Sequence, residues 1–540
     1  MDTLETSRLD DRPDGRDDSG QRTESEAPTS RSSDRRTFIT VVLLLLGVYL
    51  TTMGGHTVSV DGETYLAGTR ALAHGTTVIA RPADLDGILV LVPNKNGDWT
   101  TIAPVGTLIL LLPGYAVGKV VSLGFPAEFR EEALRLVFLA SNSLMTAVTG
   151  GLLFLLCRRL GARRRHAFLL AMTFGLGTWA WGHSQSDFSE PGTALMLTAT
   201  MLASVRWWKL PSIRNAALVG FLSGCVVLTR STTAFFVLVL LIAGVHAVPR
   251  PARLRNCVAF LAGGAVPGLL FVGNAWLRFG SPFDLGYSGM KFNTPVYEGL
   301  FGLLASPGKG IFFYAPVTLV AVFGLRLSFL QQRRYVATAC AIVALHLFVY
   351  ARFEVWSGEV AYGPRYLVPI LPIVVALLAP IISQERRWVH ATVAAAAVGF
   401  LLPGAVGATV NFQGAYFYNI NSVTSNIDNP TPTWVEMNIA WAFQPRSSPL
   451  MQNLRSVPEM IDNSFDRLNG EPRSLESVPI AYEDRIHWYA RSVQVDTWWS
   501  WWPLIGGPRR VFLLLVFPLI FLAAGLWLFI SDVRSVRRLR

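Results

Sequence analysis

Two carboxylates stand close together after the first long apolar stretch of the sequence. They are Asp61 and Glu63, in the segment GGHTVSVDGETYLAG (54–68). A carboxylate within hydrogen-bond reach of a hydroxyl can act as its general base. The alternative is an ordinary solvated loop, in which Asp61 caps a helix that starts near Glu63. The segment by itself leaves both interpretations open.

Three cations occur at the ends of later apolar stretches. Arg230 lies in LTRST, Lys309 stands between two glycines in SPGKG, and Arg365 follows a Gly-Pro pair in YGPRY. Ionisable residues in such places indicate functional sites, although the arginine in LTRST could simply extend to the lipid headgroups. Arginine grips phosphate bidentately, and the glycines around Lys309 allow backbone N–H groups to approach an anion. At the depth of the bilayer surface, Arg365 would meet the phosphate of a lipid.

A short polar stretch, WGHSQSDFSEPG (181–192), adds His183, Asp187 and Glu190. Glu190 precedes a proline and an apolar run, where an acidic residue favours a helix N-terminus. The eight histidines show neither HExxH nor another paired spacing typical of zinc. The Asp-Leu-Asp stretch at 84–86 has no second set of ligands. We therefore expect no metal.

The composition is that of a membrane protein. Hydrophobic residues make up 51% of the 540 residues and charged residues 15%, whereas soluble domains are nearer a quarter charged. The mean hydropathy is +0.39. A spanning helix needs about 20 mostly apolar residues, and the sequence contains many such runs. We expect an all-α polytopic bundle of about 12 transmembrane helices (11–13), by the same length criterion.

The expected spans and the charge between them give an orientation. The net charge of +11 is concentrated in short basic clusters between apolar runs, which the positive-inside rule places in the cytoplasm. Both termini are then cytoplasmic, and the long loops and the candidate site lie on the outer side. The predicted spans are 37–54, 135–156, 167–182, 190–207, 215–229, 232–248, 257–277, 311–328, 336–351, 366–383, 388–409 and 511–530.

One apolar run, 101–122, does not fit this alternation, because a further span would reverse the orientation of everything after it. It contains two Pro and three Gly among its apolar residues. We predict a broken, re-entrant or interfacial helix on the outer side, which protein or a cavity must cover. The alternative is an additional span that is paired with another.

Four parts of the chain follow from these patterns. Residues 1–36 are polar and nearly free of aromatics, so we expect a disordered cytoplasmic tail. Residues 37–409 form the expected transmembrane domain, with its first outer loop at 55–133. Residues 410–508 are an outer-face segment that ends in a Trp-rich stretch suited to the membrane interface. Residues 509–540 contain the last span and a basic cytoplasmic tail.

Several short sequence motifs resemble those of one protein family and occur in the same order. They are similar to those of GT-C-type membrane glycosyltransferases, in particular bacterial phospholipid carrier-dependent enzymes, and more distantly protein O-mannosyltransferases and the lipid A aminoarabinose transferase. The resemblance covers residues 40–380 approximately, and each motif is only weakly specific by itself. The motifs are Asp61-Gly62-Glu63-Thr64-Tyr65, Ala103-Pro104-Val105-Gly106-Thr107, Phe188-Ser189-Glu190-Pro191, and the stretches 278–287, 306–316 and 356–367.

The resemblance implies a reaction and a set of site residues. A sugar on a polyprenyl phosphate is attacked by an acceptor hydroxyl with inversion, and neither a cofactor nor a metal is needed. The first-loop Asp61 is the implied base, although Gly62 separates it from Glu63 and leaves the choice between them open. Arg230, Lys309 and Arg365 are the implied ligands of the donor phosphate. The implied substrate-binding residues are Tyr65, His183, Asp187, Glu190, Tyr287, Glu359 and Tyr362.

The implied partners are a polyprenyl-phosphate-linked sugar, a glycan, lipid or protein acceptor, and the lipid bilayer, with no nucleic acid. Neither the sugar, a hexose or a pentose, nor the acceptor follows from the sequence. Two other functions are open. A transporter or lipid flippase would have its charges near the middle of the membrane and internal repeats. A non-catalytic envelope-assembly protein would use 410–508 as its binding module.

Overall fold

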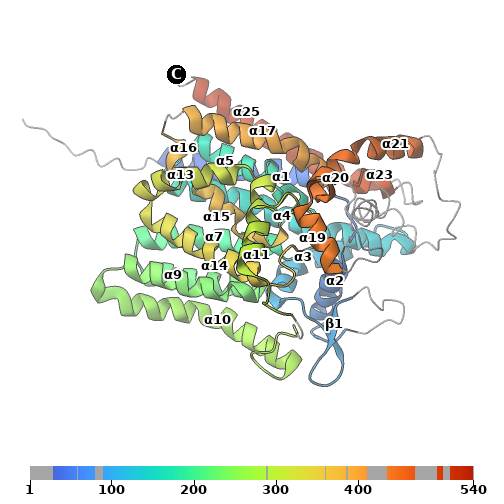
Figure 1. Cartoon of the computed structure of the whole chain (residues 1–540), viewed down its shortest axis with the longest axis horizontal. Coiled ribbons are helices and arrows are strands. Elements are labelled where there is room, and N and C mark those ends of the chain that lie inside the picture. Colours follow the sequence, from blue (N-terminus) through green and yellow to red (C-terminus); the bar gives the residue numbers. More distant parts are fainter. Residues whose placement is uncertain are drawn as a thin grey trace, which may run out of the picture.

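The computed structural model is built almost entirely of helices (Figure 1). It describes residues 28–57, 59–79, 89–287, 290–358, 361–384, 387–409, 434–468, 495–502 and 511–538. The expected tail up to residue 27, the stretch 84–86 and much of 410–508 lie outside these ranges. Within them the only sheet is a hairpin, in which β1 (Leu91–Pro93) pairs antiparallel with β2 (Trp99–Thr101).

Helices occur at all twelve predicted spans, and four of the spans, 167–182, 311–328, 366–383 and 511–530, are divided between separate helices. The span expected at 311–328 consists of α12 and α13, and that at 366–383 of η5 and two short helices. Their bounds are α1 (Pro28–Thr52), α4 (Arg130–Arg159), α5 (Arg164–Leu176), α7 (Glu190–Lys209), α8 (Ile213–Thr229), α9 (Ala234–Ala247), α10 (Arg253–Phe279), α12 (Ile311–Tyr314), α13 (Val317–Gln331), α14 (Arg333–Arg352), η5 (Arg365–Ile370), α15 (Leu371–Ala376), α16 (Ala379–Ile382), α17 (Arg387–Thr409), α24 (Val511–Leu514) and α25 (Val516–Arg538).

Eight helical segments of the described chain are long and apolar enough to cross a membrane. Helices suit this environment because they satisfy every backbone polar group within one segment. The most hydrophobic segment, at the C-terminal end, has only a small buried share, and Arg365–Ile382 is almost wholly enclosed by the others. The chain is therefore an all-α, multi-pass membrane protein.

Two expectations about helix bounds are corrected. The apolar run at 101–122 forms one continuous helix, α3 (Val105–Ser122), with Pro113 inside it, so the predicted break is wrong. Proline removes one backbone donor, and the packing of α3 against α4 and α2 (Val60–Ala73) supports the rest of the helix. Its length and composition are also sufficient to cross a membrane. In addition, α1 begins at Pro28 and not near residue 37.

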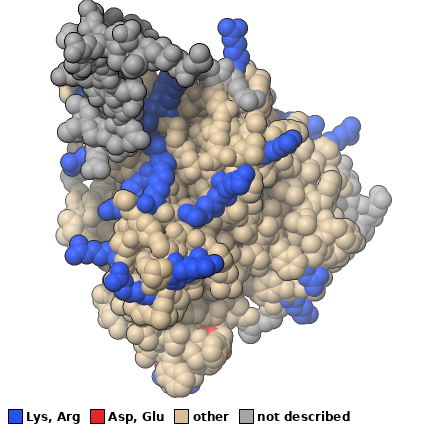
Figure 2. All heavy atoms as spheres, turned by 90° about the vertical axis from the view of Figure 1, so that its left-hand side faces the viewer, with Lys and Arg blue, Asp and Glu red and all other residues tan. Residues whose placement is uncertain are grey.

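Basic helix ends gather at one end of the bundle. Arg158 at the end of α4 donates to Asp34 on α1 over 3.0 Å, and the Lys209 ammonium at the end of α7 donates to the carbonyl of Arg159 over 2.7 Å. Figure 2 shows this face with many Lys and Arg side chains and very few acidic ones. The asymmetry is the one that the positive-inside rule associates with the cytoplasmic side.

The helices α8 and α10 run in the same direction, joined by α9, and pack closely. Gly220 permits the contact, because a Cβ atom there would lie 1.9 Å from the carbonyl oxygen of Phe260. Small residues let helix backbones approach in this way in membranes. The parallel packing brings the C-terminal ends of both helices, with Arg230 and Arg278, to the same end of the bundle.

Shorter elements cover the end of the bundle away from the basic clusters. They are α2, the β hairpin, α6 (Ala180–His183), α11 (Val296–Ala305), α19 (Trp434–Phe443), α20 (Pro449–Arg455), α21 (Val457–Leu468) and α23 (Trp498–Trp501). In Figure 1, the hairpin, α2, α19 and α20 lie at the side opposite the ends of α9 and α13. The candidate site residues that the structure describes belong to these elements, to the helix ends beside them or to the turns and loops that connect them.

Candidate active site

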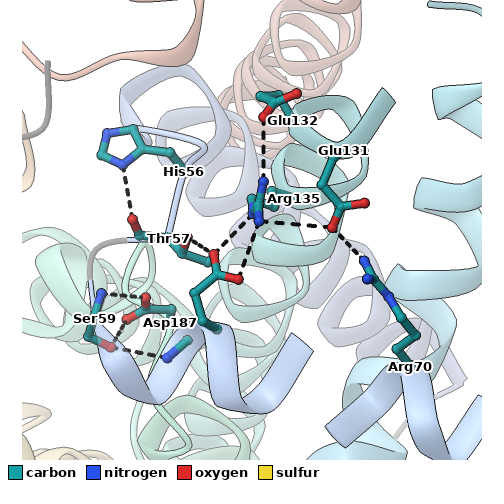
Figure 3. Close-up of polar contacts among 10 residues, drawn as sticks. His56, Thr57, Ser59, Arg70, Glu131, Glu132, Arg135 and Asp187 are labelled. Atoms are coloured by element: carbon teal, nitrogen blue, oxygen red, sulfur yellow. Dashed lines mark hydrogen bonds and ion pairs between the residues drawn. The ribbon is translucent and has the colours of Figure 1, made fainter. Parts of the chain in front are cut away.

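The first turn of α2 carries both candidate carboxylates. Its N-cap is Ser59, whose hydroxyl accepts from the backbone N–H of Gly62, so the expectation that Asp61 could cap the helix is wrong. Asp187 holds this cap in place, because its carboxylate accepts from the backbone N–H and the hydroxyl of Ser59 over 3.0 and 2.8 Å (Figure 3). The role of Asp187 is thus to fix the position of α2.

Gly62 is the residue that permits this docking. A Cβ atom there would lie 2.0 Å from the Oδ2 atom of Asp187, a separation that no side chain can adopt. The glycine that divides the two carboxylates therefore has a packing reason. It also places Asp61 and Glu63 on different sides of the first helical turn.

Asp61 remains partly exposed, and among the described residues its partner of opposite charge is Arg365. Its Oδ2 atom accepts from the Nη1 atom of Arg365 over 3.1 Å, and its side chain is 35% exposed. A single charge-assisted hydrogen bond uses only part of the acceptor capacity of a carboxylate. The remaining lone pairs can accept a proton from a substrate hydroxyl.

In Glu63, by contrast, both carboxylate oxygens accept hydrogen bonds. Arg135 on α4 donates to its two oxygens over 3.0 and 3.3 Å, and the Thr57 hydroxyl donates to it as well. Figure 3 shows Arg135 in a network that also includes Glu131 and Glu132. Burial alone would raise the pKa of Glu63, but Arg135 and Thr57 overcome this and hold the pKa below its ordinary value. Glu63 anchors α2 to α4 and is unsuited to accept a proton at neutral pH.

A second ion pair lies near the first. Arg230 donates to Glu190 over 2.9 Å and to the Ser189 hydroxyl over 3.2 Å. It also donates to the hydroxyl of Tyr350. Glu190 is buried, and a buried charge needs such a partner. The structure thus places Arg230 at the site, although much of its hydrogen-bonding capacity is used within the protein.

Tyr366 joins the two ion pairs. The guanidinium carbons of Arg230 and Arg365 lie 5.1 and 4.9 Å from the centre of its ring, and its hydroxyl accepts from Arg365 over 3.2 Å. Cations over an aromatic face are attracted by the ring quadrupole. Sequence analysis did not select Tyr366, although it directly follows Arg365 in the YGPRY word.

Lys309, His183 and Tyr362 support the turn that leads to Arg365. The Lys309 ammonium is fully buried and donates to the carbonyl of Ala361 over 2.6 Å. The Nε2–H of His183 donates to the carbonyl of Tyr362 over 2.9 Å. The Tyr362 hydroxyl donates to the carbonyl of Pro403 over 2.9 Å. These contacts fix the backbone before Arg365 and favour positioning roles over contact with substrate.

The remaining predicted substrate-binding residues are divided. Tyr65 is buried and close enough to Asp61, Glu190 and Tyr287 to interact with them electrostatically. Tyr287 is 40% exposed. Glu359 lies outside the described residues. Arg135 was not selected from the sequence because it lies at the start of a predicted span, where a basic residue has an ordinary explanation.

The assembled site is a partly exposed carboxylate beside two aromatic-stacked arginines, at one end of an apolar bundle. Such an arrangement can remove a proton from a neutral hydroxyl and stabilise negative charge that develops nearby. Among the described residues, no group of three or more His, Cys, Asp and Glu side chains could hold a metal ion. The chemistry that the site itself supplies is acid–base and electrostatic.

No protein-family model matches the sequence, and no curated protein does either. Solved membrane proteins resemble the structure, and two of them are described here. ArnT from Cupriavidus metallidurans, bound to undecaprenyl phosphate, is 13% identical with a TM-score of 0.40, over 82% of this chain and 80% of that one. The archaeal oligosaccharyltransferase AglB from Archaeoglobus fulgidus, in complex with an inhibitory peptide and a dolichol-phosphate, is 12% identical with a TM-score of 0.45, over 89% of this chain and 64% of that one. With both TM-scores under 0.5, neither similarity decides the activity of this chain.

Proposed function

We propose that this protein is a GT-C-type membrane glycosyltransferase. It moves a sugar from a polyprenyl-phosphate carrier to an acceptor hydroxyl at the outer face of the membrane. The observation that carries the proposal is the pair formed by Asp61 and Arg365, a partly exposed carboxylate held at 3.1 Å from an arginine. This pair stands at the end of the bundle opposite the basic clusters, where a lipid-linked donor and a polar acceptor can meet.

In the proposed reaction Asp61 accepts the proton of the acceptor hydroxyl as the hydroxyl oxygen attacks the anomeric carbon. The bond between that carbon and the phosphate oxygen breaks, and the polyprenyl phosphate leaves with the electron pair. Its charge rises in the transition state, where a fixed cation stabilises it most. Arg365 has a buried Nε–H without a partner among the described residues, so it retains a donor for the leaving phosphate.

The distribution of charge favours this proposal over a transporter. The ion pairs of Asp61 and Glu190 lie at helix ends or in the turns beside them, and not at the middle of long helices as midplane transport sites do. A non-catalytic assembly protein has no need for a partly exposed carboxylate beside arginines. The basic face in Figure 2 supports cytoplasmic termini, again by the positive-inside rule.

The test is a transfer assay on the purified full-length protein. It is supplied with a panel of polyprenyl-phosphate sugars, and the release of free polyprenyl phosphate is followed with candidate acceptors. We expect release from one donor class, reduced about 10²- to 10⁴-fold in Asp61→Asn, as for loss of a general base. Release by the variant at the wild-type rate would exclude Asp61 as the base. Absence of release from every donor and acceptor pair would contradict the proposal.

A further inference from the structure

A buried ion pair joins the segment between α1 and α2 to the C-terminal part of the chain. His56 is 5% exposed, and its Nε2 atom lies 2.9 Å from the Oδ1 atom of Asp496, which is 6% exposed. Gly54 permits this approach, because a Cβ atom there would lie 2.6 Å from the Oδ2 atom of Asp496. The backbone N–H of Asp496 donates to the carbonyl of Thr409, the last residue of α17, over 2.7 Å. The pair therefore connects three separate parts of the chain.

Two tryptophans that follow the aspartate cap the last turn of α1. The indole N–H of Trp498 donates to the carbonyl of Leu50 over 2.7 Å, and that of Trp499 donates to the carbonyl of Thr51 over 2.8 Å. The last carbonyls of a helix have no partner within the helix and need such donors. One short stretch near the C-terminus thus holds both the end of α1 and the residues that come after it.

Both ring nitrogens of His56 face acceptors. The Nδ1 atom lies 3.3 Å from the carbonyl oxygen of Thr57 (Figure 3), and the Nε2 atom faces the Asp496 carboxylate. A neutral imidazole has one N–H and the imidazolium has two, so only the charged ring can donate to both acceptors. Burial by itself would lower the pKa of His56, but Asp496 overcomes this and, with a smaller contribution from Asp187, raises the pKa above the ordinary 6.5.

The other ionisable groups around His56 are two neutral side chains and two carboxylates. His183 and Tyr362 line the same pocket as the ion pair. Burial lowers the pKa of His183 to about 4 and raises that of Tyr362, so both are neutral near pH 7. The carboxylates are Asp187 and, in contact with the residue after His56, Glu63. The polar lining of the pocket suits water, through which the His56 proton can exchange.

The segment that contains His56 also supports the helix of the candidate base. The hydroxyl of the next residue donates to Glu63, and Ser59 is the N-cap of α2, two residues before Asp61. Of the described residues, His56 alone forms an ion pair with Asp496. Loss of its proton leaves that carboxylate buried without a cation, which is costly. The cost is relieved when the two segments separate, and such a movement reaches the first turn of α2.

We propose that His56 is a positioning residue for the transfer reaction, because its protonated ring pairs with Asp496 and holds α2 where Asp61 can act. The effect on transfer rests on the proposed function, whereas the ion pair rests on its contacts alone. The reaction then needs a proton on His56 and none on Asp61. These opposite requirements predict a loss of rate at high pH that originates outside the residues that touch the substrate.

The test measures transfer by the full-length protein between about pH 5 and 9, a range in which histidine titrates. The variants are His56→Gln, Asp496→Asn and the matched control His74→Gln, at the exposed C-terminal end of α2. The ratio of wild-type to variant rate cancels the titration of Asp61 and of the substrate. For the first two variants we expect a ratio of about 10 to 100 in acid, the effect of a displaced base. The ratio should fall toward unity as the pH rises, and that of His74→Gln should stay near unity throughout.

Thermal unfolding in a maltoside detergent gives a second measurement that needs no turnover. The pKa of His56 in the folded protein is raised above 6.5. Its contribution to stability is therefore fully present below that value and is lost as the pH rises through the folded pKa. We expect the midpoints of wild type and Asp496→Asn to differ in acid and to converge in alkali. Asp496→Asn keeps the shape of the side chain and serves if His56→Gln does not fold.

The outcomes separate the positioning role from the proposed function. A rate ratio that is equal at every pH would show that the pair is only structural and would overturn the positioning role. Wild-type rates in both His56→Gln and Asp496→Asn would overturn it as well. A pH-dependent difference between midpoints without transfer from any donor would contradict the proposed transferase and leave the ion pair standing.

Discussion

Asp61 and Glu63 share one turn of α2, yet the protein uses them in opposite ways. Glu63 is held by both arms of Arg135 and by Thr57, and its side chain is 20% exposed. Asp61 has one hydrogen bond to Arg365 and is 35% exposed. The comparison teaches that the number of donors committed to a carboxylate decides its role. The one with spare acceptor capacity is the candidate for chemistry, and the other holds the helix in place.

The largest expected difference in transfer rate is between the two variants in which one of these carboxylates is neutralised. Asp61→Asn removes the proposed base, so we expect the transfer rate to fall about 10²- to 10⁴-fold with little change in thermal unfolding. Glu63→Gln should retain most of the rate and lower the unfolding midpoint. Steady-state rates and differential scanning fluorimetry measure the two effects. The reverse pattern would make Glu63 the base.

Gly62→Ala tests the docking that separates the two roles. The new Cβ atom would meet the Asp187 carboxylate at 2.0 Å, so α2 must shift and carry Asp61 with it. Misplacement of a catalytic group by about 1 Å can cost roughly 100-fold in rate, and we expect a loss of that order. Gly268→Ala is the matched control, since a Cβ atom there meets nothing within 4 Å. Equal activity of the two variants would show that the Asp187 contact is dispensable.

The pH dependence of stability should distinguish Glu63 from its exposed neighbour Glu131. The pKa of Glu63 in the folded protein is below the ordinary 4.5. Its contribution is therefore present above that value and lost as the pH falls through the folded pKa. Unfolding midpoints of wild type and Glu63→Gln should differ at neutral pH and converge in acid. Glu131→Gln, at a side chain that is 41% exposed, should differ little from wild type at any pH.

The smallest expected effect concerns His183. Burial lowers its pKa to about 4, so the imidazole stays neutral between about pH 5 and 8, where a histidine base would titrate. His183→Gln keeps an N–H donor for the Tyr362 carbonyl. We expect a modest loss of rate and no change in the shape of the pH–rate profile. Disappearance of an inflection near neutral pH in the variant would instead identify His183 as the group that titrates.

The sequence predicts the positions of the helices better than it predicts which side chains contact one another. Apolar length alone locates the spans, and the predicted break at 101–122 failed because one proline is tolerated inside a well-packed helix. Asp61 and Arg365 are 304 residues apart. Their residue types and their places in the chain singled them out, and the family resemblance then implied their roles as base and phosphate ligand. The contacts of Asp187 with Ser59 and of Lys309 with Ala361 were not predicted, because polarity at a helix end does not reveal which group a side chain will meet. The predicted binding of substrate by Asp187 and of phosphate by Lys309 stays a prediction.

Segments near the C-terminus pack against segments near the N-terminus. His56, just before α2, bonds to Asp496 over 2.9 Å, 440 residues later. The backbone N–H of Trp498 donates to the carbonyl of Met53 over 2.9 Å, and α25 packs along α1. During synthesis, the segment that precedes α2 can therefore form these contacts only after residues 496–498 have been made. A chain that stops before residue 496 cannot form these contacts, so they are established late in synthesis.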